Sequence, residues 1–166
     1  MTGSARKFFI VIALVAVTAV LASAQMGNQP APQAAAKAPA EASGVLFFDK
    51  DQVVKSFAAS ATLYDGNVVG RNYNVRTLKR DKPGEVEIHA QDTDIVYVLE
   101  GSATFAIGGT VVGGRNIGPG EIRGSSMQGG TSRTVSKGDV FIVPANVTHW
   151  FKEIQQPISY LTIKVR

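Results

Sequence analysis

The sequence contains two histidines, His89 and His149, and each lies in a short segment rich in polar groups that bind metal ions. Glu87 precedes His89 by two residues, and Asp94 follows it by five. Two imidazoles from distant segments and a nearby carboxylate form the ligand set of a facial metal site with open coordination positions. Because both histidines fall in such segments, we predict that they bind a metal.

The segment around His89 alternates as a β-strand does, so residues two apart share a face. One face carries Glu85, Glu87, His89 and Gln91, and the other carries Val86 and Ile88. By itself this pattern fits a face turned to solvent better than a face lining a polar pocket. The second segment favours the pocket, because His149 is followed by the aromatic residues Trp150 and Phe151.

The N-terminus has the pattern of an export signal. Arg6 and Lys7 precede an apolar run from Phe8 to Leu21, and Ala22-Ser23-Ala24 forms a small-residue cleavage site. The run is shorter than a membrane span needs. We therefore predict a signal peptide over residues 1–24, no stable membrane anchor after cleavage, and a periplasmic or secreted protein.

Residues 25–43 are rich in Pro, Ala and Gln and contain few large apolar side chains, which predicts a disordered linker. The folded domain is expected over residues 44–166. The chain has no cysteine, which excludes disulfides and thiolate metal sites. The formal net charge of +4 falls to +2 without Arg6 and Lys7, too little to indicate a nucleic-acid partner.

The folded part reads as one short helix followed by many short strands. The helix is expected to begin near Asp49 or Asp51 and to run to about Ser60, with a buried stripe of Val53, Val54, Phe57 and Ala58. The expected strands are 73–80, 85–91, 95–99, 103–107, 134–135, 140–143, 149–154 and 158–165, with a tight turn at Glu100-Gly101. This order predicts an all-β antiparallel sandwich or small barrel.

The spacing of Gly138, Pro144, Asn146, His149 and Glu153 resembles the second motif of the cupin family, with Asn146 where glycine is usual and Glu153 where asparagine is usual. Asp94 and Gly101 resemble the acid and the final glycine of the first motif, which here keeps only one of its two histidines. The resemblance implies a single-domain cupin, a jelly-roll β-barrel, from about residue 45 onward.

The resemblance also implies a ligand set. His89, Asp94 and His149 are the candidate ligands, and either Glu87 or Gln91 completes the set, with Glu87 preferred by spacing. Such a site suits a divalent ion, Mn, Fe, Ni or Zn, and a second carboxylate favours the harder Mn. Asp94 is the least secure ligand, because it is one carbon shorter than the usual Glu.

For function, the resemblance implies a metal-dependent enzyme of the dioxygenase or isomerase type acting on a small polar molecule. The alternative is a non-catalytic barrel that binds a small ligand or serves a structural role. No catalytic residue apart from the ligands can be named, so these alternatives stay open. The resemblance also implies a homodimer.

The segment 108–133 is longer than a minimal connection between the two motifs. Its Arg115, Arg123 and Arg133, with Glu121 and Met127, could form a lid or a clamp for an anionic substrate. A flexible hairpin with solvated arginines is the preferred interpretation at this stage.

Overall fold

A computed structural model describes residues 44–166, so the predicted signal peptide and linker lie outside the described residues. The structure has two helical segments, α1 (Lys50–Ala59) and the 3-10 helix η1 (Gly66–Val69). The strands are β1 (Thr62–Asp65), β2 (Tyr73–Arg80), β3 (Val86–His89), β4 (Thr93–Ile107), β5 (Thr110–Val112), β6 (Arg115–Gly118), β7 (Glu121–Gly124), β8 (Ser126–Gln128), β9 (Thr131–Ser136), β10 (Val140–Val143) and β11 (His149–Val165). Within 44–166, no helix is long and apolar enough to cross a membrane.

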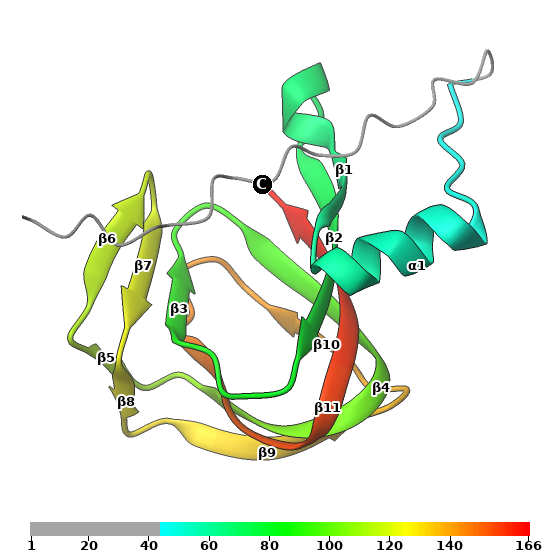
Figure 1. Cartoon of the computed structure of the whole chain (residues 1–166). Helices are drawn as coiled ribbons and strands as arrows, with labels where there is room; N and C mark the ends of the chain where they lie inside the picture. Colours follow the sequence, from blue (N-terminus) through cyan, green and yellow to red (C-terminus); the bar gives the residue numbers. More distant parts are fainter. Residues whose placement is uncertain (1–43) are drawn as a thin grey trace, which may run out of the picture. The chain divides into compact units, whose positions relative to one another are not determined.

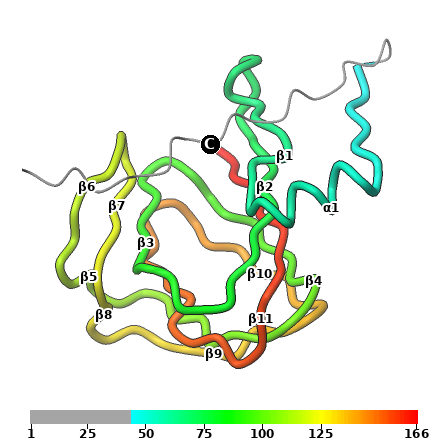
Figure 2. Tube along the Cα trace, in the orientation of Figure 1, coloured from blue at the N-terminus to red at the C-terminus, as the bar shows by residue number. Residues whose placement is uncertain are grey.

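Nine of the strands form one curled antiparallel sheet around a common interior (Figure 1). Its main path runs β1-β2-β11-β3-β7-β6, and β4 joins it by pairing with β11, β9 and β10. β5 and β8 form a separate two-stranded sheet. The trace in Figure 2 shows β3, β4, β10 and β11 bending around the same interior. The prediction of an all-β barrel-like fold with one short helix near its start is confirmed.

The two longest strands replace four shorter ones that the sequence predicts. β4 runs through Glu100-Gly101 without a hairpin turn, and its two halves both pair with β11, from Thr93 opposite Val165 to Ile107 opposite His149. Gly101 adopts a φ of +81°, and a Cβ there would overlap the carbonyl oxygen of Pro157. The predicted turn at Glu100-Gly101 is therefore wrong, because the glycine allows the strand to bend close to β11 instead of reversing.

The inner face of the curled sheet holds the apolar core. The buried cluster consists of Val96, Val98, Ala103, Phe105, Val135, Val143, Phe151, Ile158 and Tyr160. Its aromatic rings contact one another, with ring centroids of Phe151 and Tyr160 4.8 Å apart and those of Phe105 and Phe151 also 4.8 Å apart. This packed floor holds β4 and β11 together below the polar residues described next.

Helix α1 lies outside the sheet and contacts β1 and β2 (Figure 1). Asp49 caps its N-terminus through a reciprocal pair of hydrogen bonds with Gln52, as the sequence predicts. The predicted buried stripe is right only in part. Val53 and Phe57 are half-buried, but Val54 is 58% exposed, Ala58 is also exposed, and Ser56 is the buried residue. The Ser56 hydroxyl lies 2.6 Å from that of Thr77 on β2, so a polar contact fixes which side of the helix faces the sheet.

The segment 108–133 folds into short antiparallel strands, with β5 paired to β8 and β6 paired to β7. β7 pairs with β3 and with β6, which places Arg123 opposite Glu87 and Glu121 opposite His89. Arg115 and Arg133 are exposed, as the preferred interpretation expects. The side chain of Arg123 is only 17% exposed, so the expectation of solvated arginines is wrong for this residue.

Candidate metal centre

Three of the predicted ligands meet on adjacent strands. Glu87 and His89 point inward from β3, and His149, the first residue of β11, pairs with Glu87 across the two strands. One ligand atom from each of the three lies within 4.8 Å of the others, a group that could hold a metal ion. Both histidines are buried, with exposed fractions of 3% for His89 and 6% for His149.

Each imidazole is oriented by a hydrogen bond at its Nδ1 atom. Nδ1 of His89 lies 2.8 Å from Oε2 of Glu121, and Nδ1 of His149 lies 2.9 Å from the carbonyl oxygen of Val147. Both partners accept hydrogen bonds, so each Nδ1 carries the proton and each neutral ring keeps its lone pair on Nε2. Histidine ligands of metals are held in this way by a carboxylate or a carbonyl.

The Nε2 atoms converge on Glu87. Oε2 of Glu87 lies 3.3 Å from Nε2 of His89 and 3.9 Å from Nε2 of His149. Nε2 of His89 is buried and has no hydrogen-bond partner, a state shared by only two other side-chain atoms within residues 44–166. Because buried polar atoms are normally paired, an unpaired nitrogen facing a carboxylate fits a metal ligand.

The electrostatics of the cluster favour a cation between these groups. Burial alone would lower the pKa of His89, but the neighbouring carboxylates of Asp94, Glu121 and Glu87 raise it to about 10. Burial lowers the pKa of His149, which keeps this ring neutral near pH 7. A proton on His89 therefore compensates the carboxylates when no metal is bound, and a metal ion would take its place.

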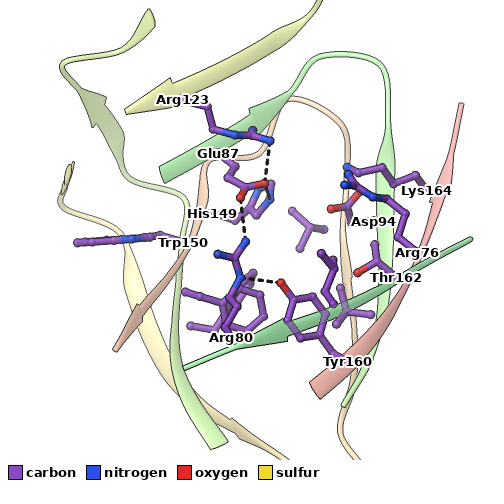
Figure 3. A pocket seen from close by; sticks show the side chains of 15 residues that line it. Arg76, Arg80, Glu87, Asp94, Arg123, His149, Trp150, Tyr160, Thr162 and Lys164 are labelled. Atoms are coloured by element: carbon purple, nitrogen blue, oxygen red, sulfur yellow. Dashed lines mark hydrogen bonds and ion pairs between the residues drawn. The ribbon is translucent and has the colours of Figure 1, made fainter. Parts of the chain in front are cut away.

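Glu87 is held as a carboxylate. Burial alone would raise its pKa, but the contact with His89 and the charge of Arg123 keep the pKa well below its ordinary value. Arg80 Nη2 lies 3.3 Å from Oε1 of Glu87, and Arg123 Nη2 lies 3.4 Å from Oε2. Two guanidinium groups thus hold the carboxylate, which lies beside His149 in Figure 3.

The two remaining predicted ligands, Asp94 and Gln91, are not part of this three-residue cluster. Oδ2 of Asp94 lies 3.5 Å from Nε2 of His89, but its Oδ1 accepts a 2.6 Å bond from Nζ of the buried Lys164. Asp94 therefore stands beside the cluster, already neutralised by a lysine. Gln91 is exposed and lies beyond the end of β3, so the structure does not bring it to the cluster. The face predicted from the alternation ends at His89, because the strand ends there.

Several site residues were not singled out from the sequence. Arg80 on β2 donates from Nε to the hydroxyl of Tyr160 at 2.7 Å, and it contacts Glu87 as well. Burial raises the pKa of Tyr160, so its hydroxyl stays protonated. The period-two alternation of β2 places Arg76, Leu78 and Arg80 on one face, and this pattern could have marked Arg80 as a site residue. It could not show that this face, rather than the opposite one, points inward.

A cavity of about 110 Å³ adjoins the cluster. Its polar lining includes Glu87, Asp94, His149, Arg76, Arg80, Arg123, Tyr160, Thr162 and Lys164, and its apolar lining includes Leu78, Val96, Phe105, Val143, Trp150 and Phe151 (Figure 3). A cavity with an apolar floor and a few convergent polar groups is the usual form of a small-molecule site.

The match to a known protein family rests on this same region. Residues 84–163 match the family model described as Cupin, which spans β3 to β11 and includes both histidines. These residues form a cupin domain. The resemblance inferred from the two motifs is therefore confirmed. No curated protein matches the sequence.

Solved structures match this chain at low sequence identity. The BH2720 protein of Bacillus halodurans is 15% identical with a TM-score of 0.50, over 72% of this chain and 80% of that one. A hydroquinone 1,2-dioxygenase in complex with Cd2+ and 4-hydroxybenzonitrile is 18% identical with a TM-score of 0.44, over 57% of this chain and 58% of that one. An oxalate decarboxylase of Lactobacillus farciminis is 15% identical with a TM-score of 0.44, over 62% of this chain and 27% of that one. The present cupin thus spans little more than half of the dioxygenase chain and about a quarter of the decarboxylase chain.

Proposed function

We propose that this cupin holds a divalent metal ion through Glu87, His89 and His149 and binds a small polar molecule in the adjoining cavity. The observation that carries the proposal is the convergence of one ligand atom each from Glu87, His89 and His149, which all lie within 4.8 Å of one another. The two histidines and one carboxylate suit Fe, Mn, Ni or Zn.

A bound divalent ion would supply Lewis-acid or redox chemistry to oxygen atoms of the ligand. The residues of the chain bind and orient. Glu121 and the Val147 carbonyl fix the two imidazoles, and Arg80 and Arg123 fix Glu87. The apolar floor limits the water that can reach a bound ligand.

Two candidate functions remain, and they differ in whether the protein converts its ligand to a product. The first is a metal-dependent enzyme of the dioxygenase or isomerase type. The second is a module that binds a small ligand without reaction, and the ion pairs favour it. Within the described residues, Glu87 and Asp94 are both bound to fixed cations and are poor proton acceptors in that state. A screen for O2 consumption with small diols, diketones and sugars would distinguish an oxygen-dependent enzyme from a binder.

Metal analysis of untagged protein tests the shared part of both functions. After reconstitution with Fe, Mn, Ni or Zn, we expect one equivalent of at least one ion to remain bound. His149→Ala should abolish this binding, and Gln91→Ala, a matched change at an exposed position of the same region, should retain it. Substoichiometric metal with every ion would refute the proposal, and metal retained by His149→Ala would show that the ligand set is wrong.

We also propose that the protein is exported to the periplasm or secreted, on the sequence pattern of residues 1–24. The N-terminal sequence of the mature protein tests this, and Gln25 is the expected first residue. Retention of the whole leader on a cytoplasmic protein would contradict it.

We propose in addition that the domain forms a homodimer through the outer face of β4 and β10. On that face Val140 is 64% exposed, Ile142 is 62% exposed, and Tyr97 opposite Val140 is 46% exposed. An exposed apolar patch of this kind is typical of protein interfaces. Sedimentation equilibrium should give twice the monomer mass, and a monomer at high concentration would contradict the proposal.

A further inference from the structure

The cavity beside the cluster contains more cations than carboxylates. Four cationic side chains line it, Arg76, Arg80, Arg123 and Lys164, against two carboxylates, Glu87 and Asp94. A divalent ion held by the cluster would increase this excess by two charges. Charges withdrawn from water are costly when uncompensated, so the lining favours a ligand that carries negative charge.

The cations differ in how they are already paired. Arg80 and Arg123 both contact Glu87, and Lys164 contacts Asp94. Within residues 44–166 the side chain of Arg76 has no hydrogen bond or ion pair, and its Nε atom is buried without a partner. Arg76 is therefore the cation of the cavity that is free to pair with a ligand.

The strand register places Arg76 on the polar wall of the cavity. It lies on β2 opposite Thr162 of β11, and the next inward residue of β11 is Lys164, which pairs with Asp94 of β4. Figure 3 shows these four side chains together on one wall, across the cavity from Glu87 and Arg80. Arg76 also lines a second cavity of about 160 Å³.

We infer that this cavity binds a small organic carboxylate, and that Arg76 is the residue that pairs with its carboxylate group. A planar guanidinium matches a carboxylate with two parallel hydrogen bonds. The apolar floor of Leu78, Val96, Phe105 and Phe151 can pack against the carbon atoms of an organic acid. An inorganic anion has no apolar part that could make this contact.

The volume limits the size of the acid. A closed cavity of 150 Å³ can hold benzene, a ring of six carbons. A cavity of about 110 Å³ therefore holds roughly four or five non-hydrogen atoms, and longer acids must extend through its opening. Acids of the size of propionate fit. The inference rests on the proposed ligand site, but the unpaired Arg76 belongs to the chain itself, so it does not require that a metal be bound.

The single tryptophan provides the readout, because Trp150 lines the cavity and donates from Nε1 to the carbonyl oxygen of Gly84 at 2.7 Å. We would titrate the protein with propionate and follow Trp150 fluorescence and its indole NMR signal at constant ionic strength. Propionamide is the matched neutral probe, and inorganic phosphate is the anion without a carbon part. The titration is repeated with metal-free and with Zn-loaded protein.

We expect saturable binding of propionate, no response to propionamide, and at least tenfold weaker binding of phosphate. Arg76→Gln should weaken propionate binding at least tenfold, and Arg76→Lys should restore part of it through its charge. Arg133→Gln, the same change at an exposed position of β9, should leave binding unchanged. Circular dichroism of each variant confirms that it is folded.

The inference is overturned if propionate gives no saturable response, if Arg76→Gln binds as well as the wild type, or if phosphate binds as tightly as propionate. A failure of the metal proposal has a different signature. In that case no ion binds in the reconstitution experiment, yet metal-free protein still binds propionate in a manner that depends on Arg76.

Discussion

Removing the Glu121 carboxylate should weaken metal binding without removing any proposed ligand. Glu121 lies directly opposite His89 in the β3–β7 pair, and its Oε2 atom lies 2.8 Å from Nδ1 of His89. The carboxylate holds the ring with Nε2 toward Glu87 and makes that nitrogen a better donor to a metal. In Glu121→Ala the ring loses this partner and can rotate.

The magnitude follows from the strength and the exposure of this contact. A hydrogen bond to a charged group contributes about 1.5 to 3 kcal/mol when it is buried. The Glu121 side chain is 29% exposed, so water can take over part of the role and the lower end of the range applies. About 1.4 kcal/mol corresponds to a tenfold loss of metal affinity, which lies at the lower end of the effects usual for residues that orient metal ligands.

A competition titration with a chelator at neutral pH measures the change. Glu121→Ala should raise the dissociation constant for Zn about tenfold, and Glu121→Gln, which keeps an acceptor oxygen, should raise it less. Glu85→Ala is the matched control, because within residues 44–166 the only ion pair of this exposed carboxylate is with Arg115, at 2.8 Å. If Glu121→Ala binds Zn as tightly as the wild type while His149→Ala does not bind it, Glu121 does not orient a ligand and the reasoning is refuted.

Two further predictions concern pH and the bend in β4. The pKa of His89 is raised to about 10 in the folded, metal-free protein, against about 6.5 in the unfolded chain. Protonation of His89 therefore stabilises the fold fully below pH 6.5, and this contribution is lost as the pH rises toward 10. Urea unfolding of metal-free protein should therefore show stability falling across this range by at most about 1.4 kcal/mol per pH unit from this group, and an equal slope in His89→Gln would assign the loss to other residues. Gly101→Ala should lower the free energy of unfolding by more than Gly108→Ala does. Both glycines have φ near +80°, which costs an alanine about 1 to 2 kcal/mol, but only at Gly101 does a Cβ overlap Pro157, while none of the described atoms lies within 4 Å of it at Gly108. Thermal and urea unfolding compare the two variants, and equal destabilisation would mean that β4 tolerates the added methyl group.

Much of the fold can be predicted from the sequence because its signals are local. The strand pattern, the Asp49 cap and the spacing of Gly138, Pro144 and His149 depend on residues close in the chain. Asn146 is an example, since the turn needs its φ of +65° and asparagine accepts that conformation. The bend at Gly101 was misread as a turn, because only the pairing of both halves of β4 with β11 shows that the strand continues.

The candidate site, like the fold, could be predicted from the sequence only in part. The sequence by itself determined which residues could bind a metal, because only two histidines exist and Glu87 alternates with His89 on one strand. Only the tertiary structure decided which acids accompany them. The β3–β7 pair brings Glu121 to His89 and Arg123 to Glu87, β11 brings Lys164 to Asp94, and the early end of β3 leaves Gln91 outside. These contacts join residues up to 70 positions apart, so their partners depend on strand register and on the curl of the sheet, which no local pattern encodes.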